Sequence, residues 1–164
     1  MADSRLKETI AQCQERTQRG AERLLKTFSF VPDDKVAWSP AKTARTPLAI
    51  LAHCCMTNRM FAKVIRGEAM TPMPSHEEIG ALSQQFEATI RDRAEAVRQM
   101  ESSRDEVVAA LASLTAERFA TTPESPFGPR PMSLWVSMPG LHMGSHAAQI
   151  DYLQTIWGDM VGHM

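Results

Sequence analysis

Hydrophobic residues recur three and four positions apart along much of the chain, with charged residues between them. That spacing places the hydrophobic side chains on one face of a helix and leaves the opposite face in water. Four stretches show the pattern, and they are residues 4–28, 47–66, 75–114 and 134–157. No stretch has the alternating pattern that predicts a β-strand. The chain is therefore predicted to be all-α, a four-helix bundle forming a single domain over residues 1–164.

Residues with special backbone roles mark the first two expected helices. Thr46 can cap the start of the second helix, Pro47 suits its first position, and Gly67 can stop it. In the first helix, Thr17 and Gly20 interrupt the apolar stripe. Small side chains let another backbone come near, so we expect a neighbouring helix to approach closely there.

The third stretch is predicted to form one long helix over residues 75–114. Ser75 and Glu78 have the spacing of a capping box at its start, and no proline interrupts it. Its weakest point is the polar run 101–105, where a bend is expected. His76 falls in the first turn and is interpreted as a surface residue.

Two long, proline-containing connections separate these helices, and proline excludes a continuous helix in either. The first spans residues 30–46, where we expect Trp38 to pack over one end of the bundle. The second spans residues 115–132. In the fourth helix, Pro139 favours either a kink or a helix that effectively begins there. Residues 158–164 are expected to fray.

Composition narrows the class of protein. A net charge of −1 with mixed signs offers no basic surface for nucleic acid. We find no apolar run of bilayer-spanning length, so no membrane partner is expected. The polar, charged N-terminus is not a secretory signal. Three cysteines, including the adjacent Cys54 and Cys55, do not form a disulfide framework and fit a reducing cytoplasm.

Candidate chemistry is concentrated in a pair of histidines, His142 and His146. Residues four apart lie one turn apart on the same helix face, so both imidazoles point the same way. Two neutral imidazoles so placed can bind one metal ion. The pair on its own is equally consistent with two partly buried histidines that only pack.

A third histidine changes that balance. His53 lies in the second turn of the second helix, and Met56 and Met60 share its face. Bundles build metal sites from inward side chains on facing helices. His53, His142 and His146 would supply three nitrogen ligands and leave one or two positions open, as catalytic rather than structural sites do.

These features together resemble the DinB superfamily, which includes bacillithiol transferases and mycothiol-dependent maleylpyruvate isomerases. The resemblance covers residues 6–157 and rests on a Trp-x-Pro element at Trp38, the histidine of the second helix, and a terminal His-x3-His-x2-Gln-Ile helix. It implies a bundle with up-down-down-up connection, a homodimer, and a divalent metal. The implied ligands are His53, His142 and His146, with zinc or nickel as the first candidates.

The resemblance also implies a small-molecule substrate and, in some relatives, a low-molecular-weight thiol as cosubstrate. Ala147 and the Pro139-Gly140 pair depart from the family pattern, which leaves the substrate open. Gln149, one turn past His146, could orient a ligand from outside the metal shell or could be a surface amide.

Two classes of function follow. The first is a metal-dependent enzyme, either a thiol-dependent transferase or isomerase or, alternatively, a hydrolase that activates water. The second is a non-catalytic, dimeric, stress-related binding protein. Cys54 and Cys55 adjoin His53, but small apolar packing is the favoured interpretation of both.

Overall fold

The structure is a computed structural model that describes residues 2–68 and 72–164, and within these ranges it contains helices and no strand. The helices are α1 (Ala2–Ser29), the 3-10 turn η1 (Asp33–Lys35), α2 (Pro47–Arg66), α3 (His76–Glu87), α4 (Arg93–Ala112), α5 (Ala116–Phe119) and α6 (Met132–Ile156). The all-α prediction is confirmed.

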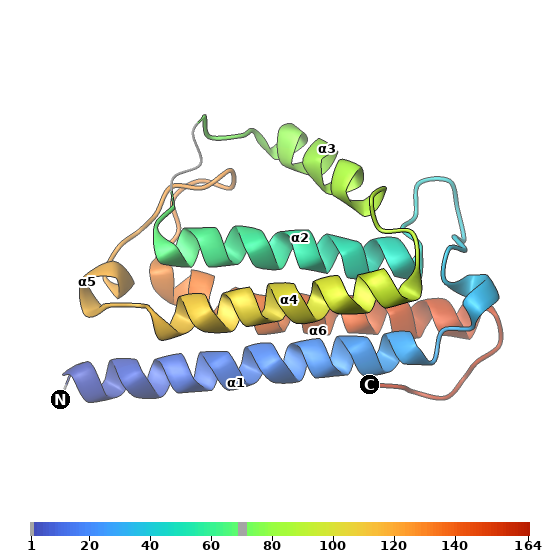
Figure 1. The fold of residues 1–164 in the computed structure, drawn as a ribbon, viewed down its shortest axis with the longest axis horizontal. Coiled ribbons are helices and arrows are strands. Elements are labelled where there is room, and N and C mark those ends of the chain that lie inside the picture. Colours follow the sequence, from blue (N-terminus) through green and yellow to red (C-terminus); the bar gives the residue numbers. More distant parts are fainter. Residues whose placement is uncertain (1, 69–71) are drawn as a thin grey trace.

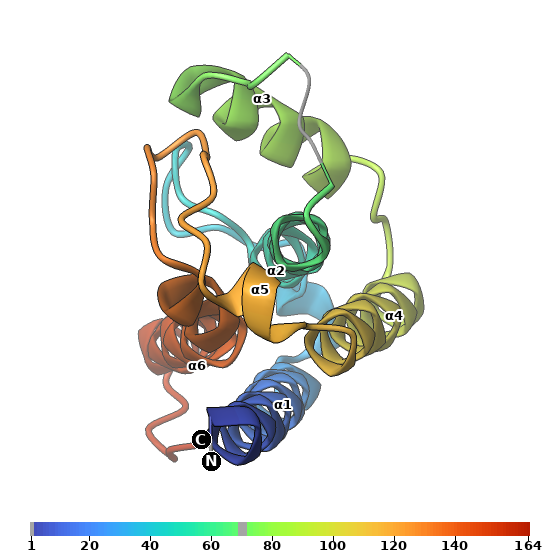
Figure 2. The same ribbon diagram turned by 90° about the vertical axis from the view of Figure 1, so that its left-hand side faces the viewer.

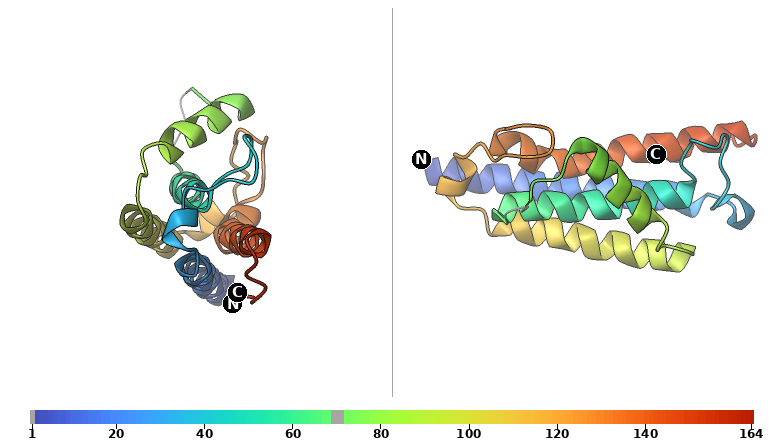
Figure 3. Two further views of the ribbon diagram at one scale, coloured as in Figure 1. Left: turned by 90° about the vertical axis from the view of Figure 1, so that its right-hand side faces the viewer. Right: turned by 90° about the horizontal axis from the view of Figure 1, so that it is seen from above.

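Four long helices, α1, α2, α4 and α6, lie side by side as a bundle, and α3 crosses the outside of α2 (Figures 1 and 2). Followed along the colours of Figure 1, α1 and α6 run in one direction while α2 and α4 run in the other. The parallel order of α2 and α4 requires a crossover connection, and the segment that contains α3 makes it (Figure 3). That crossover brings α3 over the middle of the bundle.

Helix α2 is the central apolar element. It is long and apolar enough to cross a membrane by length and composition alone, which the sequence analysis did not anticipate. Of its most apolar window, 67% is buried inside the bundle, as in the core helix of a globular protein. Its predicted ends are confirmed: Thr46 Oγ1 accepts from the Ala49 amide, and Gly67 closes the helix at φ 81°.

The expected long third helix is in fact two helices. The capping box of Ser75 and Glu78 starts α3 as predicted, but the helix ends at Glu87. Helix α4 then starts afresh, because the Asp92 carboxylate accepts a hydrogen bond from the Glu95 amide at 2.8 Å. The run 101–105, where a bend was expected, is regular helix inside α4.

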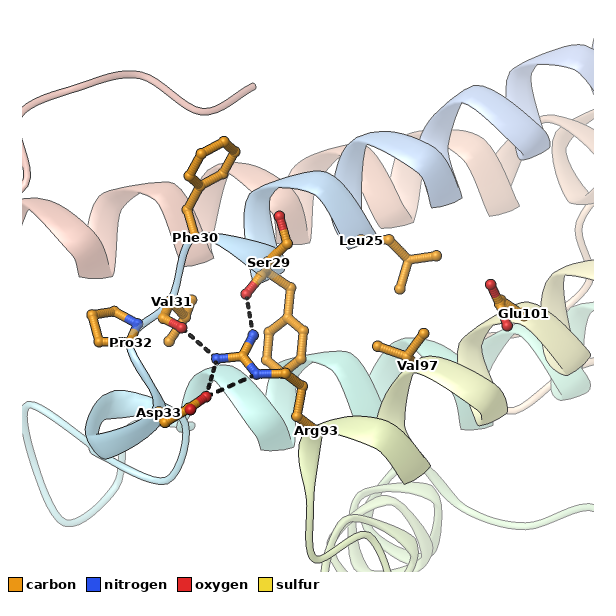
Figure 4. Close-up of a pocket in the computed structure, with 10 residues that line it drawn as sticks. Leu25, Ser29, Phe30, Val31, Pro32, Asp33, Arg93, Val97 and Glu101 are labelled. Carbon is orange, nitrogen blue, oxygen red and sulfur yellow. Dashed lines mark hydrogen bonds and ion pairs between the residues drawn. The ribbon is translucent and has the colours of Figure 1, made fainter.

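Arg93, in the first turn of α4, fastens that helix to the end of α1. Its guanidinium donates to the carbonyl oxygens of Phe28 and Val31 and to the Asp33 carboxylate (Figure 4). The carbonyls at a helix C-terminus lack intrahelical donors, so a cation there satisfies them. A hollow of about 600 Å³ surrounds this contact, and no histidine lines it. We assign Arg93 a structural role.

The close approach expected at Gly20 is also present, and its partner is Gly140 on α6. A Cβ built on Gly20 would lie 2.8 Å from the Gly140 oxygen, and one on Gly140 would lie 2.6 Å from the Arg16 oxygen. Helix α6 continues unbroken from Met132 through Pro139, so it does not begin at that proline. This close contact sets the position of α6 against α1, just before the turn of α6 that carries His142.

The 30–46 connection and the C-terminal tail both pack against the bundle, the first as expected and the second more tightly than expected. Trp38 packs on the core and meets Trp157 edge-on, with ring centroids 5.3 Å apart. The predicted fraying of residues 158–164 is wrong for His163, which is buried and stacks on Phe30 at 4.0 Å. The backbone oxygen of His163 accepts from the Thr27 hydroxyl, which ties the tail to α1.

Candidate metal centre

The structure brings together the three histidines that the sequence singled out. His53 comes from α2, while His142 and His146 lie one turn apart on α6. One ring nitrogen of each lies within 4.8 Å of the others, and the ring centroids are 4.4 to 5.2 Å apart. The fourth histidine of the sequence analysis, His76, is exposed as expected and contacts the Phe127 ring instead.

All three rings are partly buried, and burial is the main reason that their pKa values are low. The pKa of His53 falls to about 4 and that of His142 to about 3, and the pKa of His146 is lowered too. The nearby guanidinium of Arg45 lowers each of them further. The imidazoles are therefore neutral at pH 7, which leaves their nitrogen lone pairs available to a cation.

Hydrogen bonds fix the orientation of two of the rings. His146 Nδ1 lies 2.7 Å from Gln149 Oε1, and His53 Nδ1 lies 2.9 Å from Ser83 Oγ. When each Nδ1–H donates to that oxygen, the opposite nitrogen, Nε2, carries the lone pair. His146 Nε2 also lies 3.1 Å from His142 Nε2, so ring nitrogens of both α6 histidines meet at one point. The arrangement is the outer support that metal-ligating histidines have.

Ser83, the hydrogen-bond partner of His53, belongs to a chain of hydrogen-bonded polar side chains that the sequence analysis missed. Ser83 Oγ donates to Glu87 Oε1 at 2.8 Å, and Arg45 Nε donates to the same carboxylate oxygen at 3.0 Å. Ser83 is 2% exposed and is the only residue of α3 classed as buried. We call this series, His53–Ser83–Glu87–Arg45, the His53 relay. It joins α3 and the α1–α2 connection to the three-histidine group.

His142 lacks such support. Its Nδ1 is buried and has no hydrogen-bond partner among the residues that the structure describes. The three imidazoles as a whole nevertheless fit a divalent ion, because three neutral nitrogens lie close together. Two of the rings, those of His53 and His146, are also oriented by hydrogen bonds at Nδ1.

A pocket of about 330 Å³ opens onto His53 and His142. Its walls are mostly apolar, and besides the two histidines the residues that line it from α2 and α6 are Met56, Thr57, Met60, Phe61, Leu134, Trp135 and Met138. Ile79 of α3 and two residues of the 115–132 connection, Phe127 and Arg130, complete the lining. The histidines therefore lie at the edge of a ligand-sized cavity, at the small end of the usual range of roughly 300–1,000 Å³.

Comparison with known proteins assigns the chain to a family. Residues 16–150 match the sequence model of the DinB superfamily. The chain belongs to the DinB superfamily. No curated protein matches it as a relative. The resemblance inferred from Trp38 and the three histidines is thus confirmed at the level of the family.

Two solved structures share the DinB fold of this chain. One is described as the mycothiol-dependent maleylpyruvate isomerase, with a TM-score of 0.71 and 14% identity over 86% of this chain. The chain spans only 60% of the isomerase's length. The other, described as the sibling lethal factor precursor DfsB, has a TM-score of 0.70 and 18% identity, covering 91% of this chain and 96% of DfsB. At these identities the likeness establishes the fold alone.

The cysteines of this DinB chain are not members of the three-histidine group. Cys13, Cys54 and Cys55 are free and buried. Burial raises the pKa of Cys55 to about 12 and raises that of Cys54 well above its ordinary value. A thiol acts as nucleophile or metal ligand only as thiolate. Apolar packing is therefore the interpretation that the structure favours for both.

Proposed function

We propose that this protein is a divalent-metal-dependent enzyme in which His53, His142 and His146 hold the ion. The observation that carries the proposal is the convergence of three neutral imidazoles at the edge of an apolar pocket. Three protein ligands leave one or two coordination positions open. All-nitrogen ligation suits zinc or nickel.

The reaction class that we propose is thiol-dependent transfer or isomerisation of a small molecule. A divalent ion with an open position supplies the capacity to hold a thiol in its deprotonated form at neutral pH. The His53 relay and Gln149 orient the rings, and the apolar walls exclude water from the reacting groups. The mycothiol dependence stated for the isomerase of similar fold supports a thiol cosubstrate here. We further propose a cytoplasmic homodimer.

A second candidate is a non-catalytic binding protein. DfsB, which is described as a lethal factor precursor, has the same fold, and this chain covers 96% of it. The DinB bundle thus occurs in a protein whose description names no reaction.

Turnover assays separate the candidates. Zinc- and nickel-loaded protein is incubated with a panel of small electrophiles and with bacillithiol, mycothiol or glutathione. His53→Ala removes a ligand, and His76→Ala is the matched control because that histidine is exposed and outside the group. We expect thiol consumption with the wild type and His76→Ala but not with His53→Ala. Hydrolysis without thiol consumption would favour a hydrolase, and no turnover by fully loaded protein would favour the binding role.

A further inference from the structure

The pocket beside the metal centre contains a single charged side chain. Of its described lining residues, Arg130 alone carries a charge at pH 7, and no carboxylate faces the cavity. The remaining polar residues are Thr57 and two histidines of the three-histidine group, His53 and His142. Among the described lining residues, no acidic side chain therefore neutralises the Arg130 guanidinium.

Arg130 is available to a ligand. Its Nη1 donates to the neighbouring Pro129 oxygen at 3.1 Å, and the side chain is exposed. A guanidinium carries five N–H donors in a planar fork that matches a carboxylate, so most of its capacity remains. This contrasts with Arg93, whose donors are engaged by two carbonyl oxygens and a carboxylate.

The remaining walls suit a small, adaptable, apolar occupant. Met56, Met60 and Met138 line the cavity, and methionine's flexible thioether adjusts to ligands of different shape. Phe127 adds an aromatic ring to the wall, and that ring contacts the ring of His76, which does not itself line the cavity. A volume of about 330 Å³ equals that of roughly eleven water molecules, which is room for a molecule of about ten heavy atoms.

We propose that this pocket binds a small molecule with an apolar body and one anionic end, and that Arg130 holds the anion. Such molecules are then the substrate class of the metal centre, and this second statement rests on the proposed function. Binding itself needs no metal, because Arg130 and the apolar walls supply it. The pocket can therefore be tested on metal-free protein.

Methionine methyl groups provide a direct readout. Chelator-treated protein labelled with carbon-13 at the methionine methyls is titrated by NMR with octanoate, octanol and octylamine, which share a chain and differ in charge. We expect the signals of Met56, Met60 and Met138 to shift, while that of Met100, fully buried in the core, stays in place. Octanoate should bind roughly fivefold more tightly than octanol, the upper range for an exposed ion pair, and octylamine most weakly.

Two arginine variants complete the test. Arg130→Gln should abolish the preference for octanoate and leave octanol binding unchanged, whereas Arg91→Gln, at an exposed arginine outside the pocket, should change neither. Equal binding of octanoate and octanol to the wild type, no pocket shifts with any ligand, or an equal effect of both variants would overturn the proposal. Failure of the metal to bind would refute the proposed function and leave these outcomes unaffected.

Discussion

The His53 relay can be tested by removing one hydroxyl group. Ser83→Ala deletes the oxygen that lies 2.9 Å from His53 Nδ1 and 2.8 Å from Glu87 Oε1. The carboxylate cannot take over, because it lies 3.8 Å from His53 Nδ1 and is itself held by Arg45. His53 then loses both its fixed tautomer and its orientation. Loss of such outer partners weakens metal binding about 10- to 100-fold, which corresponds to about 1.4 to 2.7 kcal/mol.

Competition with a chromophoric zinc chelator measures that loss. Ser137→Ala is the matched control, because the Ser137 hydroxyl donates only to the Leu134 oxygen of its own helix and should leave zinc affinity unchanged. Glu87→Gln keeps the shape of the relay but removes its charge, so its effect should be smaller than that of Ser83→Ala. Wild-type zinc affinity in a folded Ser83→Ala protein would refute the reasoning that α3 holds a metal ligand in place.

Two further predictions concern stability. The lowered pKa values of His53 and His142 mean that the unfolded chain binds more protons below about pH 6.5. As the pH falls from about 6 to 4, the free energy of unfolding of the metal-free protein should therefore decrease, by at most about 2.7 kcal/mol per pH unit. Urea titrations at several pH values measure this, and a flat profile would contradict it. Gly140→Ala places a methyl 2.6 Å from the Arg16 oxygen and should destabilise by about 1–3 kcal/mol, whereas Gly144→Ala, with open space around it, should stabilise by up to about 1 kcal/mol. Thermal unfolding compares them, and equal effects would show that the α1–α6 crossing is not tight.

Local rules predicted the helices well where capping decides the boundary, as at Thr46 and Ser75. The break between α3 and α4 was missed although a cue was present. Asp92 and Glu95 have capping-box spacing, but hydrophobic residues on both sides kept a helical period that masked the break. Periodicity alone does not distinguish one helix from two whose faces stay aligned. The buried position of His163 could not be predicted, because its partners come from distant parts of the chain.

Some residues of the candidate site could likewise be predicted from local sequence rules, and others could not. His142 and His146 share one helix, so their common face follows from spacing alone. Adding His53 required the bundle and the family pattern. Ser83 and Glu87 were not found because their proximity to His53 depends on the crossover that carries α3 over α2. Arg130 was missed because it lies on an irregular connection whose path no periodic pattern predicts.

The central claim is that the three histidines hold one divalent ion, and elemental analysis of tag-free protein tests it most directly. Wild-type protein and His76→Ala should each carry about one equivalent of metal after dialysis, since the described residues contain one set of three ligands. His53→Ala and His142→Ala should carry only traces while remaining folded. Equal metal content in the wild type and His53→Ala would contradict the account.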